Sequence, residues 1–534
     1  MRAVSASFAK RFAALAALAV FATAQPAAAD LVAVGHEFTV SGATSAYSPA
    51  VGASSQANGQ FVVTWGEREY PSPFSLHGQR FDHQAVLVAD PFLVSSDGNI
   101  HYGPTSIAVA RDGSFVVTWL TGDGIAADIA ARAFDSSGTP RGDAFVPGTD
   151  ATASRRTRPS VVADPDIGFV VVWDEYYRND QSYIGLNTRV AARRLDAGGA
   201  IAGSELVVAV SPVSESVDGG FDTVRDGSVA PAGPGEFVVV WESVDDSYWY
   251  GDNSYVVHTR LPTSSVSGLG APSRFAEDDG QGEHLQGDAR VASDSFGNVT
   301  IVWNTSSGCS SGWYGWNDAG CYSRNDGIVM ERFDADGASL PATSPVNVFD
   351  NEGQYDPAVA VSPAGDFVVA WTSGPTPDPD KSPNTAPPQD GDETGVFLRA
   401  FNCAGTPLGD EDIQVNELTT GWQAQASVAI SASGYVLVTW SSWPGDTTGT
   451  ISARAFRFDP PCPLCGDADA SGEIRTSDAL QALRAGVGSG SCSARRCDVD
   501  ADGAVTSGDA LSILIWSIGG NARLRCDPSL PDVP

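Results

Sequence analysis

The sequence predicts an all-β protein, a seven-bladed β-propeller of four-stranded blades that is closed by an N-terminal strand and followed by a small α-helical module. The first observation is a strand ending in tryptophan that recurs seven times along the chain. The second is that a short strand precedes each copy and two follow it, with Gly-, Pro-, Asp- and Ser-rich turns between them. Four short antiparallel strands in each of seven units are typical of a propeller.

The first 29 residues are predicted to be a secretory signal peptide and not part of the fold. A basic region at Arg2, Lys10 and Arg11 precedes an apolar run at residues 12–24 and three alanines at residues 27–29. The apolar run is too short to span a bilayer, and no later run reaches the length that a spanning helix needs. We therefore expect cleavage near Ala29 and a secreted or cell-surface protein without membrane insertion.

Residues 30–459 form the predicted propeller. The tryptophan strands are residues 61–65, 115–119, 169–173, 237–241, 299–303, 367–371 and 435–440. The repeat opens with a lone fourth strand at residues 36–40, and its last unit ends after a third strand at residues 451–458. We therefore predict that these two segments pair and close the ring, which removes an exposed sheet edge. A β-solenoid, with shorter repeats, is the alternative.

The loops after the tryptophan strands and the loops between blades are predicted to share one face. Aromatic side chains beside acids and amides on this face suit a carbohydrate or a protein partner. The predicted ligand-face residues are Tyr176, Tyr177, Tyr248, Trp249, Trp313, Trp316 and Trp443. The alternative is that these rings pack the insertions against one another. The seven strand-end tryptophans are predicted to be core residues.

Residues 460–534 form the third predicted part, with acidic loops at residues 467–478 and 498–509. Each loop has oxygen-bearing side chains at positions 1, 3, 5 and 12 and glycine at position 6, the pattern of a calcium-binding loop. The predicted ligands of two calcium ions are Asp467, Asp469, Ser471, Glu473 and Asp478, and Asp498, Asp500, Asp502, Ala504 and Asp509. Glu473 and Ala504 would contribute backbone carbonyls. Two solvated acidic turns are the alternative.

The two loops lie 31 residues apart, and each closing aspartate begins an Asp-Ala-Leu segment. This arrangement resembles the dockerin family, whose duplicated loop–helix units bind calcium and insert into cohesin modules. The resemblance covers about residues 462–528 and implies a cohesin-like partner. It also implies partner-binding residues at loop positions 10 and 11, which are Thr476, Ser477, Ser507 and Gly508 here. Dockerins often carry a Ser-Thr pair there, so Gly508 departs from the pattern.

Eight cysteines in an exported chain predict disulfides. Cys309 and Cys321 flank one insertion and are expected to pair with each other. The tail holds Cys462, Cys465, Cys492, Cys497 and Cys526, with Cys403 as the expected sixth member. A Cys403–Cys462 bond is one pairing, and the connectivity stays open. The rival is a zinc site from the cysteines at 462, 465, 492 and 497.

The formal net charge of −34 opposes binding to nucleic acid and to anionic membranes. No catalytic motif has a credible structural context: the Gly-x-Ser-x-Gly string at residues 308–312 lacks the strand and helix of a nucleophile elbow. Enzymatic activity therefore stays undecided, and an enzyme would most simply act on the glycosidic bonds of a polysaccharide.

Three functions remain open. The first is a secreted, calcium-binding modular protein with a monomeric propeller that recognises a polysaccharide, a surface glycan or a protein, and a tail that docks on a cohesin-like partner. The second is a dockerin-borne propeller glycosidase or polysaccharide lyase of polysaccharide catabolism, which a close pair of acids in the central funnel would favour. The third is a structural cell-surface protein.

Overall fold

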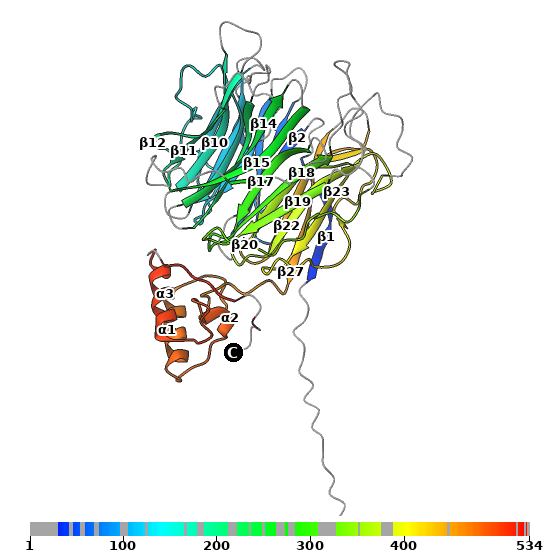
Figure 1. Ribbon diagram of the computed structural model, residues 1–534. Coiled ribbons are helices and arrows are strands. Elements are labelled where there is room, and N and C mark those ends of the chain that lie inside the picture. Colours follow the sequence, from blue (N-terminus) through cyan, green and yellow to red (C-terminus); the bar gives the residue numbers. More distant parts are fainter. Residues whose placement is uncertain are drawn as a thin grey trace, which may run out of the picture.

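The computed structural model describes residues 30–530 with internal gaps. The gaps are residues 42–45, 54–58, 69–73, 97–104, 123–126, 165–167, 179–185, 212–221, 234–235, 248–250, 263–272, 276–283, 308–326, 351–352, 375–387, 446–448, 520–521 and 528–529. The predicted signal peptide lies outside the described residues. Within them, the strands form seven antiparallel sheets, six with four strands and one with three, which confirms the seven-bladed propeller (Figure 1).

The blades follow one another along the chain. Blade one consists of β2 (Ala46–Ala53), β3 (Phe61–Glu67), β4 (Ser75–Phe81) and β5 (Phe92–Ser95), and blade two of β6 (Ser106–Val109), β7 (Phe115–Thr121) and β8 (Asp128–Phe134). Blade three consists of β9 (Arg155–Asp164), β10 (Gly168–Arg178), β11 (Leu186–Leu195) and β12 (Ile201–Val210), and blade four of β13 (Asp222–Pro231), β14 (Glu236–Ser247), β15 (Gly251–Pro262) and β16 (Ser273–Phe275).

The last three blades repeat the pattern. Blade five consists of β17 (His284–Ser293), β18 (Val299–Ser307), β19 (Gly327–Phe333) and β20 (Ser339–Leu340), and blade six of β21 (Gly353–Val361), β22 (Phe367–Gly374), β23 (Gly395–Phe401) and β24 (Ile413–Gln414). Blade seven consists of β25 (Trp422–Ile430), β26 (Tyr435–Trp443), β27 (Thr450–Asp459) and β1 (Asp30–Ser41). The first strand of each blade is its inner strand, and the inner strands contact one another around the ring.

The N-terminal strand closes the ring. β1 pairs antiparallel with β27, in a register that sets Leu31 opposite Phe458 and Phe38 opposite Ala453. The predicted pairing of residues 36–40 with residues 451–458 is therefore confirmed. The first and last strands of the propeller therefore lie in the same blade, and their pairing holds the two ends of the ring together.

The propeller core lies between blades. The tryptophans that end the second strands are at most 5 % exposed, which confirms them as core residues. Trp440 of blade seven, for example, packs in one cluster with Val368 and Leu398 of blade six. Such inter-blade packing arises because Phe-Val-Val-Val-Trp strands carry apolar side chains on both faces, and each face covers a neighbouring sheet.

The C-terminal tail contains α1 (Thr476–Gly486), α2 (Ala494–Cys497) and α3 (Ser507–Ser517) around a small core that includes Ile474, Ala482 and Ile513. Disulfides join Cys465 to Cys526 and Cys492 to Cys497. In the described part of the chain, no helix combines the length and apolar character that a membrane-crossing segment needs.

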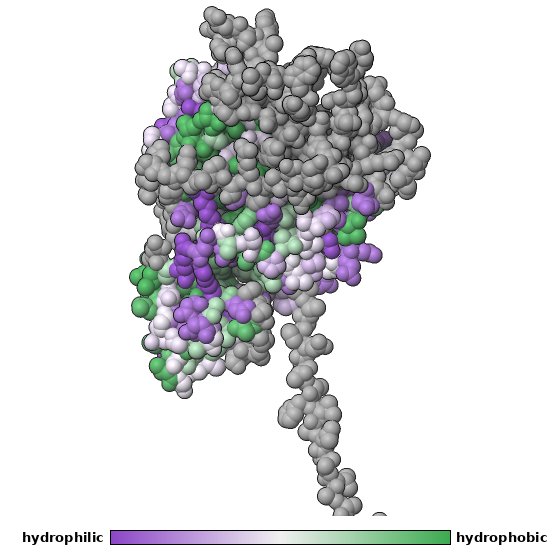
Figure 2. Space-filling model, viewed as in Figure 1, coloured by the Kyte–Doolittle hydropathy of each residue, from purple (hydrophilic) through white to green (hydrophobic). Residues whose placement is uncertain are grey.

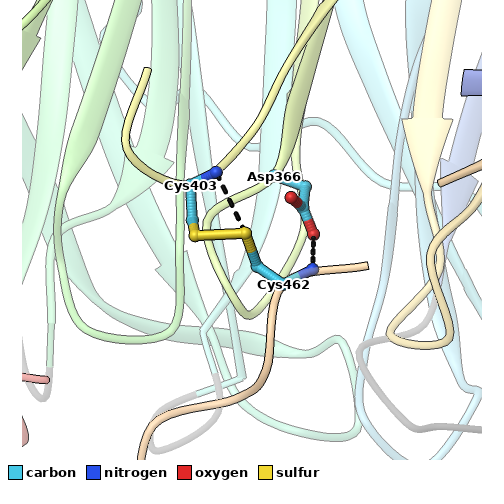
Figure 3. Close-up of side chains that lie close together, drawn as sticks. All are labelled: Asp366, Cys403 and Cys462. Carbon is cyan, nitrogen blue, oxygen red and sulfur yellow. Dashed lines mark hydrogen bonds between the residues drawn. A yellow bond between two sulfur atoms is a disulfide. The ribbon is translucent and has the colours of Figure 1, made fainter. Parts of the chain in front are cut away.

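The tail packs on the propeller face where the inner strands end, which we call the docking face (Figure 1). The Cys403–Cys462 disulfide joins the two parts covalently, and the Cys462 N–H donates to Asp366 Oδ2 at 2.7 Å (Figure 3). Phe296, in a turn of blade five, packs against Trp516 of α3 with 6.0 Å between ring centroids. The tail is thus fixed to blades five and six.

The cysteines at 403 and 462 are joined in the pairing raised from the sequence, and Cys309 and Cys321 lie outside the described residues. All four cysteines of the rival zinc site are oxidised in disulfides. That zinc prediction is wrong, because a disulfide sulfur offers no thiolate to a metal.

Candidate functional site

The inner strands of all seven blades surround a central channel of about 790 Å³. This volume lies within the range of about 300–1,000 Å³ that is usual for ligand pockets. The inner strands run from the end of the channel that we call the mouth to the docking face. Because the tail packs against the turns that follow the inner strands, the mouth lies on the opposite side of the propeller from the tail.

Five inner strands carry a left-handed residue at the same repeat position, and none of the five is glycine. We call these residues the polar ring: Arg158, Asp226, Asp288, Asp356 and Gln425, with φ angles of 52°, 61°, 53°, 52° and 59°. Each lies 15 residues before the tryptophan of its blade, at 173, 241, 303, 371 and 440. In every case the pairing with the second strand shifts register there.

All five members of the polar ring line the channel. A left-handed conformation costs a residue other than glycine on the order of 1–3 kcal/mol, less for aspartate, whose short polar side chain tolerates it. Such strain persists where the surrounding structure imposes it, and it concentrates at ligand sites. Five consecutive blades therefore keep a polar-ring residue in the left-handed conformation although that conformation is unfavourable.

One side of the ring is neutralised by an ion pair between Arg158 and Asp226. The backbone N–H groups of Asp226 and Gly227 donate to the carboxylate of Asp174, at 2.9 and 3.2 Å. Asp174 is fully buried behind the ring, and burial raises its pKa to about 7. This carboxyl supports the bulged backbone of blade four from behind, so its role is structural.

The other side of the ring has two adjacent carboxyl groups, Asp288 on β17 and Asp356 on β21. Burial, and then the negative charge of Asp288, raise the pKa of Asp356 to about 6, while the Arg290 guanidinium opposes the shift. Among the described residues, no group donates a hydrogen bond to the Asp356 carboxyl. A half-buried carboxyl with a raised pKa and no hydrogen-bond donor can hold and release a proton near neutral pH.

Of the predicted ligand-face aromatics, Trp443 at the end of β26 lines the channel and is half-buried. Trp422 lies opposite it in the strand pair and does not line the channel. Tyr248, Trp249, Trp313 and Trp316 lie outside the described residues.

Tyr176 and Tyr177 instead pack within blade three. The Tyr177 hydroxyl donates to Glu175 Oε2 at 2.6 Å, and the Arg189 guanidinium lies 5.2 Å from its ring centroid. Arg155 lies 5.5 Å from the Tyr176 ring centroid. The contacts of these two tyrosines thus agree with the alternative interpretation, in which the rings pack the insertions.

The polar ring could not be predicted from the residue types in the sequence. A residue-type search misses it because its members are an arginine, three aspartates and a glutamine. The signal in the sequence is the constant spacing of 15 residues between each ring residue and the tryptophan of its blade. This spacing can be recognised only once the inner strands are aligned with one another.

The two acidic loops of the tail have the same internal geometry. Position 1 of each loop accepts from the backbone N–H of position 6: Gly472 to Asp467 Oδ2 at 2.8 Å, and Gly503 to Asp498 Oδ2 at 2.9 Å. Position 4 is left-handed in both, at Ala470 and Ala501. These turns curl each loop upon itself, as a loop that encloses an ion must.

The carboxylates gather inside the loops. Ligand oxygens of Asp467, Asp469 and Asp478 lie within 4.8 Å of one another, as do those of Asp498, Asp500 and Asp502. Burial raises the pKa of Asp467, Asp478 and Asp498. Hard oxygen ligands around one point fit a divalent cation such as calcium.

Asp478 and Asp509 also fix the helices to the loops. Asp478 accepts from the backbone N–H of Arg475 at 2.7 Å and of Asp469 at 3.0 Å, and Asp509 accepts from the N–H of Thr506 at 2.7 Å. The predicted partner-binding residues Thr476, Ser477, Ser507 and Gly508 are exposed at the starts of α1 and α3.

No family model matches the chain, and no curated protein matches it. Solved structures with a similar fold include a protein of unknown function from Dyadobacter fermentans (11% identity, 80% of this chain and 98% of that chain, TM-score 0.41) and a PL25 ulvan lyase (12%, 78% and 95%, 0.44). Another is the GH93 α-L-arabinofuranosidase of Fusarium graminearum (14%, 68% and 94%, 0.39). Polysaccharide lyases and glycoside hydrolases are among the solved structures found, and similarities this low assign the chain to no family.

Proposed function

We propose that this is a secreted, two-part carbohydrate-binding protein. The propeller binds a polysaccharide at the channel mouth, and the tail holds two calcium ions and docks on a cohesin-like partner. The observation that carries the proposal is the polar ring, which directs five polar side chains into one channel whose mouth lies on the face opposite the tail.

The lining of the channel suits a sugar chain. Trp443 offers a ring face for the C–H groups of a sugar, and Gln425, Ser427 and Ser106 offer donors and acceptors for its hydroxyls. A pocket of this kind combines an apolar contact with a few placed polar groups. The net charge of −34 opposes a polyanionic chain, so we assign a neutral polysaccharide.

The tail suits attachment. Its two acidic loops carry the oxygen ligands for calcium, and its helices expose apolar side chains toward solvent, visible on the outer edge of the tail in Figure 2. These side chains are Leu480, Leu483, Val487, Leu511, Leu514 and Ile518, at 39–69 % exposure. They lie on α1 and α3 or directly after them, on the two helices whose first residues the dockerin resemblance assigns to partner binding.

Affinity electrophoresis through gels containing xylan, arabinan, galactan or glucomannan tests the propeller part of the proposal. We expect at least one of these neutral polysaccharides to retard the protein, and we expect Trp443→Ala to abolish the retardation. Trp422→Ala is the matched control, since Trp422 lies opposite in the strand pair but outside the channel lining. Equal retardation of the two variants would contradict the assignment of the site.

A further inference from the structure

We infer that Asp356 and Asp288 are the proton donor and the base of a glycosidic-bond hydrolysis performed on the polysaccharide at the channel mouth. The inference rests on the proposed function, since the ligand must first enter the channel. It goes further by assigning a reaction and two catalytic residues.

Asp288 and Asp356 occupy the same position of the polar ring on consecutive blades, and both line the channel. Their inner strands, β17 and β21, are direct neighbours. Two carboxyl groups are therefore presented side by side to whatever occupies the channel.

Asp356 differs from the other carboxyl groups nearby in its partners. Asp226 is paired with Arg158, and Asp174 receives two backbone N–H groups. Asp356 has neither kind of partner among the described residues, and only Arg290 provides a nearby positive charge. A half-buried carboxyl without a partner carries an energetic penalty unless it is protonated or a ligand engages it.

Burial and the charge of Asp288 hold the pKa of Asp356 at about 6, so Asp356 retains its proton in mildly acidic solution. The charged groups that face Asp356 are Asp288 and Arg290 on β17, and Arg158 and Asp226 lie further around the channel. Two carboxyl groups in different environments can divide the roles of acid and base.

The reaction balances with water as the only co-reactant. Asp356 donates its proton to the glycosidic oxygen, and the bond from that oxygen to the anomeric carbon breaks with its electron pair on the oxygen. A water oxygen bonds to the anomeric carbon, and the proton of that water passes to Asp288. Exchange with solvent then returns the proton to Asp356 and leaves Asp288 ionised.

The test uses the full-length protein with xylan, arabinan, galactan and glucomannan as probes and measures newly formed reducing ends. We expect cleavage of the retarding polysaccharide, and a rate about 10²–10⁴-fold lower for Asp356→Asn and for Asp288→Asn. Asparagine also tolerates the left-handed backbone, so both variants should fold. Asp410→Asn, at an exposed site outside the channel, is the control that keeps the wild-type rate.

The pH profile separates proton donation from a merely structural role. Because the proton donor must be protonated, cleavage by the wild type should fall as the pH rises through about 6. Binding by Asp356→Asn in the gel assay should be retained.

The outcomes distinguish this inference from the proposed function. If no probe retards the protein, the proposed function fails. If a probe is bound but releases no reducing ends, or if its products carry a new carbon–carbon double bond from elimination, the hydrolysis inference alone fails. Wild-type cleavage by Asp356→Asn would overturn the inference as well.

Discussion

The propeller and the tail are stabilised in different ways. In the described part of the chain, the propeller has seven buried apolar clusters, one at each boundary between blades. The tail has one cluster of ten buried residues, of which two are disulfide-bonded cysteines. A domain this small cannot bury enough apolar surface by itself, so its cross-links add stability, and calcium bound at the proposed sites would add more.

The difference in stabilisation fits the two proposed roles, carbohydrate binding by the propeller and calcium-dependent docking by the tail. A closed ring of packed blades can hold a strained set of polar side chains in its channel, because the surrounding packing opposes their relaxation. A small cross-linked module can instead respond to calcium without disturbing the ring. Changes to either part should therefore affect that part first.

The largest expected effect tests the closure of the ring. Removing residues 30–41 deletes β1 and leaves the outer edge of β27 unpaired. With about 1 kcal/mol for each lost backbone hydrogen bond, we expect the free energy of unfolding to fall on the order of 5 kcal/mol. Chemical denaturation followed by tryptophan fluorescence measures it, with the chain that begins at residue 30 as the reference. An unchanged midpoint would contradict closure by β1.

The second effect tests the junction of the two parts. Burial raises the pKa of Asp366 from 3.8 to about 7, so the protonated acid is the stable form of this residue at the docking face. Its contribution to stability is complete below the ordinary carboxyl pKa and is lost as the pH rises through about 7. Asp366→Asn cannot ionise, and its carbonyl can still accept from the Cys462 N–H.

We therefore expect Asp366→Asn to be more stable than the wild type at pH values above about 7, on the order of 3 kcal/mol, and to lose this advantage in acid. Thermal melts at a series of pH values measure the difference. Asp410→Asn, an exposed site, should follow the wild type at every pH. Parallel curves for Asp366→Asn and the wild type would show that Asp366 does not titrate at the junction.

The third effect tests calcium. An ion present at 100 times its dissociation constant stabilises the folded tail by about 2.7 kcal/mol. Chelation should remove this stabilisation from the tail and leave the propeller transition unchanged. The Asp478→Ala, Asp509→Ala double variant should release no heat on calcium titration, whereas Asp410→Ala should titrate as the wild type does. Calcium uptake by the double variant would refute the proposed ligands.

The smallest effect concerns the exposed ion pairs of the interface. Asp336 in blade five pairs with Arg523 and Arg525 of the tail, and all three are about half exposed. Asp336→Asn should cost about 0.2–1 kcal/mol, because water screens such pairs. The cost should shrink at high salt. A cost that does not change with salt would indicate that the pairs act through packing.

Much of the fold could be predicted because the repeat is explicit in the residues. The seven tryptophan strands define the blades, and the lone strand at residues 36–40 requires a partner, which β27 provides. The acidic loops could also be recognised, since calcium-type spacing is local, and their binding of calcium stays a prediction. Both kinds of signal depend on near neighbours in the chain.

The polar ring and the junction depend on residues far apart in the chain. Asp288 and Asp356 become neighbours only when two blades stand side by side, and the raised pKa of Asp366 follows from its burial at the docking face. Sequence spacing specifies neither burial nor the angle between blades. The bulge that gives Asp356 its left-handed backbone likewise shows only in the strand register.

The central claim is that the channel binds the polysaccharide and the tail binds calcium. Polysaccharide binding in the presence of a calcium chelator tests this claim most directly. We predict that a chelator leaves the retardation of the wild type by its neutral polysaccharide unchanged, while Trp443→Ala abolishes it with or without calcium. Loss of binding on chelation, together with normal binding by Trp443→Ala, would place the carbohydrate site on the tail and contradict the account.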